Sequence, residues 1–506
     1  MKRAKRILSL LLALMMILAL VACADDPAQN PSGEKPGSSG SSDSSGSSDS
    51  SLSEKQEEVE NFVMPERPVA DMTGKEYIII QHQPVDTPFK YSQDSRLGEL
   101  AAARIAEVQE LYGCTISFSQ IPEDTFVTQM QSLGFSDEGG DMVFSDICAP
   151  LRRTLGTGGS ESMMVDMLTV DHIINFWDED KWGNITAKET VMAGGYFYGV
   201  TPALWIDYTP LPYYLYTYNK DLLQQFEIPD LQEYWEEEEW DRNTMLQVIR
   251  DCYDDTGAAT IVGMTATRQH MTRACFLSTG ADFLIIDKIN ADRTAEWTNG
   301  FLSPEVQESL QWLNTTLKTY GKHFNTTTGS WFAHEPFLDG LTLMCSTRPK
   351  EVFDQIVTTA SFDFGLIPWA GLEPNYISGF YEDVCSVAIP TFAQNPEHTA
   401  FLMADLFEGL DGMETQDDII AYYRENYFAT DLDVQFLLKQ GASLQYTYWP
   451  NKGDVVIDSI ASTIDVVSSA KTLIDRYASQ LDPIIEEHIL PNKVAIEAYR
   501  QNGYFR

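Results

Sequence analysis

The spacing of apolar residues changes along the chain, and the changes predict alternating strands and helices. Residues 77–80 form a continuous apolar run, which is typical of a strand covered on both faces. Over residues 95–112 the apolar side chains recur at helical spacing, and Gly113 ends that helix. Residues 114–118 alternate as a strand does, and a further helix over 124–133 leads to a third strand at 142–144.

This order of elements predicts a parallel sheet with right-handed crossovers. In such sheets ligands gather at the carboxyl ends of the strands. These ends carry Gln81, His82 and Gln83 after the first strand, and Ser145 and Asp146 after the third. We expect ligand contacts from Gln83 and Asp146. The alternatives are a solvent-facing loop residue for Gln83 and a helix cap for Asp146.

The rest of the chain is richer in helical patterns, and no internal repeat is visible. Helices are predicted at 218–225, 241–253, 304–320, 396–410 and 470–489, with short strands at 341–345, 362–367 and 384–389. The part of the chain that follows residue 70 has roughly 435 residues, too many for one hydrophobic core, and suits two domains.

The N-terminus has the pattern of an export signal. Four basic residues precede an apolar run over residues 7–22. The run has about 16 residues, fewer than the roughly 20 that a permanent membrane helix needs. Residues 20–23 (LVAC) resemble the bacterial lipobox, which implies cleavage before Cys23 and a diacylglyceryl group on its thiol. The alternatives are an ordinary signal peptide with a chance cysteine, or a short membrane anchor.

A low-complexity segment follows the proposed anchor. Residues 25–53 are mostly Ser, Gly, Pro and Asp, so they have almost nothing apolar to bury and should form a flexible tether. A tether of about 30 residues has a root-mean-square reach of roughly 30 Å. We therefore assign 1–22 to a lipoprotein signal peptide and 23–70 to a lipid-anchored tether on the outer face of the membrane.

Charge and cysteine spacing exclude several kinds of partner. The formal net charge is −41, and no basic block occurs beyond the signal peptide, so nucleic acid is an unsuitable partner. Six cysteines besides Cys23 are scattered without any CxxC spacing, so we expect no metal site and no cofactor. Disulfides are permitted outside the cytoplasm, and the sequence leaves their pairing open.

Five segments resemble, in the right order, motifs of the extracellular solute-binding proteins (family 1) that serve ABC importers of sugars and oligosaccharides. They are residues 194–202 (GGYFYGVTP), 218–223 (YNKDLL), 331–344, 362–368 (FDFGLIP) and 383–401. The resemblance implies a monomeric α/β protein with the two-lobed periplasmic-binding-protein-like fold, a hinge and an interlobe ligand cleft. It also implies ABC permease subunits as partners and no catalytic residues.

The resemblance sets approximate lobe boundaries. It implies lobe 1 at 71–210 and 385–440, and lobe 2 at 211–384 and 441–506. The chain should cross between the lobes near 207–216, near 377–384 and again near 440–449.

Sugars are held by aromatic rings beneath their apolar faces and by polar side chains around their rims. The densest aromatic stretch lies at the first expected crossover, where we expect ligand contacts from Trp205, Tyr208 and Tyr213. At least half of the aromatic residues there should instead be core, because one face of the following strand must be buried.

Three further candidates lie near later segments of the cleft. Arg348 follows a strand where the family often places a stacking Trp; it could pair with an acidic sugar or form a surface salt bridge. Tyr381 and Asp383 lie in the second expected crossover. Tyr446, Tyr448 and Trp449 could close the cleft or pack the last helices.

Two other functions compete with solute capture for an ABC importer. An exported, aromatic-rich, acidic chain could be a glycan-active enzyme with paired carboxylates. However, no spacing singles out such a pair, and the sequence has no G-x-S-x-G, Walker or H-E-x-x-H motif. A binding protein for a non-sugar solute, or one that serves a signalling receptor, would have the same sequence features.

Overall fold

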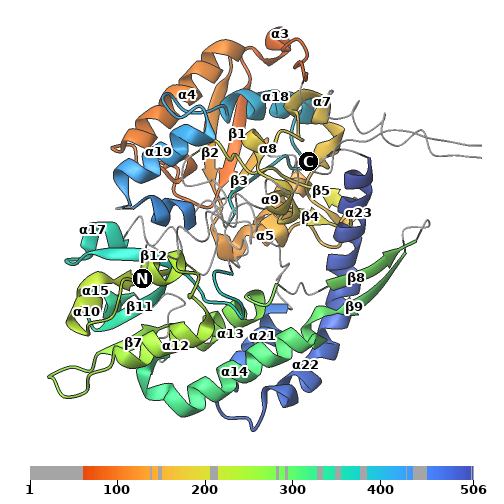
Figure 1. Cartoon of the computed structure of the whole chain (residues 1–506). Coiled ribbons are helices and arrows are strands. Elements are labelled where there is room, and N and C mark those ends of the chain that lie inside the picture. The colour runs from red at the N-terminus through yellow and green to blue at the C-terminus, as the bar shows by residue number, and fades with distance from the viewer. Residues whose placement is uncertain are drawn as a thin grey trace, which may run out of the picture. The chain divides into compact units, whose positions relative to one another are not determined.

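We analysed a computed structural model of the chain (Figure 1). It describes residues 61–136, 139–145, 151–205, 215–280, 284–290, 294–326, 334–347, 355–376, 384–428, 430–436, 453–502 and 504. These residues belong to one compact unit, which spans Asp49–Arg506. The export signal, Cys23 and most of the expected tether lie outside the described residues.

The first lobe is built around a four-stranded sheet of order β13-β3-β1-β2. Its strands are β1 (Glu76–Gln81), β2 (Thr115–Gln120), β3 (Met142–Ser145) and β13 (Ser386–Ala388). β1 is parallel to β2 and to β3, with Ile79 opposite Phe118 and Met142, whereas β13 is antiparallel to β3. The parallel sheet expected from the apolar pattern is confirmed.

Helices of the first lobe surround this sheet and form part of its core. They are α3 (Val69–Met72), α4 (Arg96–Tyr112), α5 (Phe126–Ser136), α7 (Asp171–Ile174), α8 (Glu179–Trp182), α9 (Ile185–Glu189), α18 (Pro396–Leu406) and α19 (Gln416–Asn426). α4 begins after Ser95, whose hydroxyl accepts the Gly98 N–H, and ends at Gly113 in the left-handed conformation. A hairpin of β4 (Met192–Ala193) and β5 (Tyr196–Phe197) is joined to the sheet because Val200 pairs with Val387.

The second lobe has a five-stranded sheet of order β10-β7-β11-β6-β12. Its strands are β6 (Leu215–Asn219), β7 (Val262–Thr265), β10 (Phe324–Asn325), β11 (Thr342–Thr347) and β12 (Phe364–Pro368). β7, β10 and β11 are parallel, and β6 is antiparallel to β11 and β12. All five residues of β6 are buried, so both faces of this strand are core.

Helices and one hairpin complete the second lobe. The helices are α10 (Lys220–Gln225), α11 (Leu231–Glu236), α12 (Arg242–Asp251), α13 (Arg268–Leu277), α14 (Pro304–Tyr320), α15 (Glu335–Leu338) and α17 (Val357–Thr359). The hairpin consists of β8 (Leu284–Ile289) and β9 (Ala295–Asn299). As expected, α14 begins with Ser303 as its cap and Pro304 at its first position.

The last helices extend further than the sequence predicts. α21 (Gly453–Ala461) is followed by α22 (Ala470–Ile484), a π-helical turn η8 (Ile485–Ile489) and α23 (Leu490–Gln501). The sequence predicts a helix over 470–489 from the spacing of its apolar residues. The helix instead continues through η8 into α23, past Pro491.

Short 3₁₀ turns connect several of these elements. They are η1 (Pro88–Lys90), η2 (Glu123–Thr125), η3 (Gly159–Glu161), η4 (Met167–Thr169), η5 (Gly300–Leu302) and η6 (Gly321–His323).

The lobe boundaries remain predictions, but two contacts bear on them. Arg67, which the sequence places in the tether, donates two hydrogen bonds to Asp405 of α18, at 2.6 and 2.8 Å. Asp433 was expected in lobe 1, yet it accepts the backbone N–H of Leu366 in β12 of the second sheet, at 2.7 Å. Residue 433 therefore contacts the second sheet.

The described part of the chain has no helix that is both long and apolar enough to cross a membrane. Five cysteines fall within the described ranges, and each is buried: Cys114, Cys252, Cys275, Cys345 and Cys385.

Candidate functional site

Each sheet has one polar end at which several strands finish or begin, and we call these two ends the first and the second edge. In the first sheet, the carboxyl ends of β1, β2 and β3 lie at the same edge as the first residue of β13, because Ser386 pairs with Ser145. In the second sheet, the carboxyl ends of β11 and β12 lie beside the first residue of β6, since Thr347 and Pro368 both pair with Leu215. The nine residues 206–214 connect one edge to the other, and they can span at most roughly 30 Å.

At the first edge, Gln81 organises the loop that follows β1. Its side chain is fully buried, and its Nε2 donates to the carbonyls of Pro84 at 2.8 Å and of Gln83 and Thr87 at 3.2 Å. Its Oε1 accepts the N–H of Phe89 at 3.1 Å. One buried amide therefore fixes a loop in which Phe89 has a left-handed backbone, with φ of 51°.

Gln83 lies on this fixed loop, at the edge where the sequence predicts a ligand contact. Its Nε2 is 3.1 Å from Nε2 of His82, and both side chains are half-buried. Gln120, at the end of β2, donates from Nε2 to the His82 carbonyl at 3.1 Å. The edge thus presents two amides and an imidazole, which are groups that can donate to and accept from hydroxyls.

Trp205 occupies a different position from the one the sequence suggests. Its ring is fully buried and lies 5.3 Å from the Phe89 ring and 5.1 Å from the Phe407 ring, between centroids. Its indole N–H donates to the Glu408 carbonyl at 2.9 Å. In this arrangement Trp205 supports the loop that carries Gln83 and has no face open to a ligand, so its surroundings favour a core role.

The second edge is lined by paired hydroxyl groups. The hydroxyl oxygens of Thr217 and Thr347 lie 2.7 Å apart at this edge. The Thr265 hydroxyl oxygen, at the end of β7, lies 2.8 Å from that of Thr342, the first residue of β11. Just beyond β7, Nδ1 of His270 is 3.0 Å from the Ser346 hydroxyl. All these groups are buried, so they stabilise the packing of the strands and are not exposed to solvent.

A buried charge also lies close to this edge. Arg273 of α13 is fully buried, and its guanidinium is 3.7 Å from the carboxylate of Asp458 in α21. Burial raises the pKa of Asp458, and the nearby Arg273 opposes that shift. This pair holds the first of the C-terminal helices against the second lobe.

Most of the residues that the sequence predicts for the site lie outside the described residues. They are Asp146, Tyr208, Tyr213, Arg348, Tyr381 and Asp383, and the same is true of Tyr446, Tyr448 and Trp449. Three of them adjoin described residues that are buried. Asp146 directly follows the buried Ser145, and Arg348 follows the buried Thr347. Asp383 precedes the buried Val384. Their roles in ligand binding remain predictions.

Several residues of these edges are not predicted from the sequence. Gln120, Thr217, His270, Arg273 and Ser346 belong to strand ends or to the helix that follows β7. The sequence does contain one indication of where the helix after β7 begins, because Thr267 is a residue type that caps helices well. The Thr267 hydroxyl accepts the His270 N–H at 3.1 Å. This cap places His270 and Arg273 in the first turns after the strand.

One thiol, Cys275, lies in the helix that follows β7. Burial raises the pKa of Cys275 in α13 to about 12, so this thiol stays protonated at neutral pH. Among the described residues, no group of three or more His, Cys, Asp and Glu side chains could hold a metal ion.

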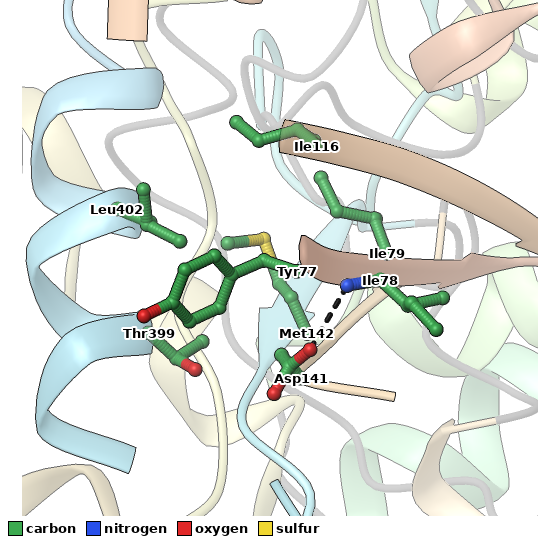
Figure 2. A pocket seen from close by; sticks show the side chains of 8 residues that line it. All are labelled: Tyr77, Ile78, Ile79, Ile116, Asp141, Met142, Thr399 and Leu402. Atoms are coloured by element: carbon green, nitrogen blue, oxygen red, sulfur yellow. Dashed lines mark hydrogen bonds between the residues drawn. The ribbon is translucent and has the colours of Figure 1, made fainter. Parts of the chain in front are cut away.

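One small cavity lies beneath the first sheet, at the end opposite the proposed site. Figure 2 shows it between β1, β3 and α18, lined mostly by apolar side chains such as Ile79, Met142 and Leu402. Its volume is about 10 Å³, barely enough for one water molecule. Asp141 at its rim accepts the Ile78 N–H at 2.9 Å (Figure 2), so this place is part of the packing of β1 against β3.

Comparison with solved structures shows the same fold. An ABC substrate-binding protein from Listeria monocytogenes in complex with cycloalternan matches 81% of this chain and 99% of its own, with 13% identity and a TM-score of 0.56. An extracellular solute-binding protein from Staphylococcus aureus in complex with maltose matches 81% and 98%, with 13% identity and a TM-score of 0.55. The chain therefore has the two-lobed α/β fold of solute-binding proteins, as the sequence predicts.

Proteins of this fold differ in what they bind. UgpB from Mycobacterium tuberculosis, in complex with glycerophosphocholine, matches 81% of this chain and 98% of its own, with 13% identity and a TM-score of 0.51. No protein-family model and no curated protein matches the sequence.

Proposed function

We propose that this chain is a receptor that captures a solute between its two lobes for an ABC importer, and that the solute is a sugar or an oligosaccharide. The observation that carries the proposal is the arrangement of the two sheets. In each sheet several strands finish or begin at one polar edge, and in α/β sheets ligands bind at the carboxyl ends of the strands.

The chemistry at these edges supports a neutral, hydroxyl-rich ligand. The described part of the first edge offers the amides of Gln83 and Gln120, and the molecule as a whole has a net charge of −41. Amides can exchange hydrogen bonds with hydroxyls without bringing a charge into the site. The aromatic and charged candidates Tyr208, Tyr213 and Arg348 would add stacking and rim contacts. Tyr381 and Asp383 would do so from the second crossover.

Capture requires no covalent step. A ligand that contacts both lobes stabilises the arrangement in which they are close, and a membrane partner can respond to that arrangement. We propose permease subunits as this partner, and a monomeric receptor.

We also propose that the receptor is held to the outer face of the cell membrane by a lipid on Cys23. The lipobox-like residues 20–23 and the Ser/Gly-rich segment that follows support this. Two or more acyl chains would hold the protein firmly, whereas a single chain holds only marginally.

A thermal-shift titration of the full chain tests the proposed ligand class. Maltose, maltotetraose and cycloalternan are compared with glycerophosphocholine. A ligand at about 100 times its Kd should stabilise the folded state by about 2.7 kcal/mol and raise Tm. If no sugar changes Tm while glycerophosphocholine does, the sugar assignment is wrong.

Two controls separate binding from other effects. Gln83→Ala should weaken the sugar response, whereas Gln129→Ala, an exposed amide on α5 that bonds only to Thr125 at 2.8 Å, should leave it unchanged. Product analysis after long incubation with each glycan tests the competing enzyme function. Hydrolysis of an oligosaccharide by the purified chain would overturn a purely binding role.

A further inference from the structure

The C-terminal helices connect the two lobes by a route of their own. We call residues 470–501 the strap: α22, the π-helical turn η8 and α23, which form one continuous helical run. Figure 1 shows this run passing from α14 of the second lobe to β4 and β5 of the first. It brings the chain back to the first lobe after the crossovers described above.

The first half of the strap is fastened to the second lobe. Asn299, at the end of β9, donates from Nδ2 to the Ala478 carbonyl at 3.0 Å and to the Asp482 carboxylate at 2.8 Å. At the start of α22, Oε1 of Gln311 in α14 accepts the Ser469 hydroxyl and the Ala470 N–H, both at 3.0 Å. α22 therefore moves with α14 and β9.

The second half is fastened to the first lobe through the β4–β5 hairpin. Asn492 is buried; its Oδ1 accepts the Gly195 N–H at 2.9 Å, and its Nδ2 donates to the Met192 carbonyl at 3.2 Å. Lys493 forms an ion pair with the buried Glu189 of α9 at 3.1 Å. The Tyr499 ring lies 5.4 Å from the Trp177 ring, between centroids. α23 therefore moves with the first lobe.

The helix is irregular between these two attachments. η8 has π-helical geometry, and Pro483 and Pro491 lie just before and just after it. A proline removes a backbone N–H from the helical ladder, and π turns and prolines are the usual places where helices bend. The weakest part of the ladder thus lies between the segment held by one lobe and the segment held by the other.

A groove beside the strap has walls on both lobes. Its volume is about 540 Å³, and it is lined by Thr186 and Glu189 of α9, by Asp287 and Lys288 of β8, and by Lys493 and Arg500 of α23. Because α9 belongs to the first lobe and β8 to the second, the width of this groove depends on the angle between them. A change of that angle can therefore be absorbed here without breaking either attachment.

We infer that the strap controls how far the two lobes can move apart, by bending at η8 while its ends stay fixed to one lobe each. Release of α23 from the first lobe should let the lobes separate further. A straighter helix at η8 should hold them at a narrower range of distances. The inference concerns the lobes alone and is independent of which solute the cleft takes.

Distance measurements on the ligand-free full chain test this inference. Nitroxide labels are introduced through an unnatural amino acid at Ala103 of α4 and Thr319 of α14, two exposed sites on different lobes, so that the native cysteines stay unmodified. Electron–electron resonance then gives the interlobe distance distribution. Asn492→Ala and, separately, Lys493→Glu should shift and broaden it, and hydrogen exchange of 490–501 should become faster.

Two further variants separate control of the interlobe distance from simple destabilisation of α23. Asn502→Ala is the matched control, because this exposed amide donates only to the Ala498 carbonyl of its own helix, at 2.8 Å. The double variant Pro483→Ala/Pro491→Ala restores both N–H groups and should narrow the distribution, so the test does not depend on a destabilised protein. Faster exchange in α23 with an unchanged distribution overturns the inference, as does an equal shift in Asn502→Ala.

Discussion

At the scale of single residues, the burial of the Lys188 ammonium costs free energy of folding. This residue lies fully buried in α9, where its ammonium donates to the Gly183 carbonyl and sits 5.4 Å from the centroid of the Phe176 ring. Burial lowers its pKa from 10.5 to about 8, while the nearby Glu179 and Asp178 oppose the shift. Between these two pH values the unfolded chain keeps a proton that the folded chain has lost.

The free energy of unfolding should therefore rise with pH over this window. A difference of 2.5 between the two pKa values (10.5 − 8) corresponds to about 3 kcal/mol. We expect wild type to gain up to this amount relative to Lys188→Met as the pH rises from 8 to 10.5, measured by urea unfolding. Lys471→Met, at an exposed site, is the control and should show no such trend. A parallel pH profile for wild type and Lys188→Met would contradict the prediction.

A second residue-scale prediction concerns Asp405, which fixes the start of the folded body. Burial alone would raise its pKa, but hydrogen bonds from Arg67 and Tyr112 outweigh this and hold the pKa below its ordinary value. A carboxylate of this kind adds stability above its unfolded pKa and loses it as the pH falls through the folded pKa.

Asp405→Asn should lower the free energy of unfolding at pH 7 by about 2–4 kcal/mol, because it removes a nearly buried carboxylate that accepts hydrogen bonds from the exposed Arg67 and the buried Tyr112. The difference from wild type should shrink in acid, and urea unfolding at a series of pH values would measure it. Glu107→Gln breaks only an exposed pair with Arg104 and should change stability by less than about 1 kcal/mol. Equal losses in the two variants would argue against a special role for Asp405.

At the scale of elements, the packing of α12 against β7 depends on one glycine. A Cβ at Gly263 would lie 2.1 Å from the Ile249 carbonyl oxygen, which belongs to backbone and cannot turn aside. Gly263→Ala should therefore destabilise the second lobe by about 1–3 kcal/mol, as overpacking does. Gly321→Ala is the control, since a Cβ there meets nothing within 4 Å. Chemical unfolding would measure both, and similar values would refute the close approach as the cause.

Helices and strands were the features that the sequence predicted best. Strongly periodic segments such as α4 and α14 are confirmed to within one or two residues, because burial of one face dictates their spacing. Contacts between distant segments leave no such periodic signal. The sequence suggests that Trp205 contacts the ligand, but the rings of Phe89 and Phe407 enclose it. The helix predicted over 470–489 continues to residue 501, and its last part is held by the distant residues Gly195 and Glu189.

The site was predicted far less completely than the fold. The parallel β1–β3 arrangement correctly placed Gln83 at the edge of the first sheet. Gln120 and Ser346 were missed, because only the pairing of strands far apart in the sequence brings their ends to the same edges. Six of the eight predicted contacts lie beyond the described residues and can be tested only by ligand binding.

At the scale of the whole molecule, the folded body and its proposed anchor should be separable. The Ser/Gly-rich segment that follows Cys23 has few apolar side chains to pack against the body. Cys23→Ser should therefore abolish metabolic labelling by palmitate and move the protein from the membrane fraction into the soluble extracellular fraction, because no acyl chain would remain.

The same substitution should leave the body itself unchanged. Its Tm and its response to sugars should match those of the wild type, because residues 25–53 are mostly Ser, Gly, Pro and Asp and have almost nothing apolar to pack against the body. Cys114→Ala is the informative comparison: it removes a buried thiol, so it should lower Tm while leaving membrane attachment intact. Retention of Cys23→Ser in the membrane fraction would instead indicate that the apolar run at 7–22 is the anchor. Capture near the membrane would then depend on an uncleaved segment rather than on a lipid.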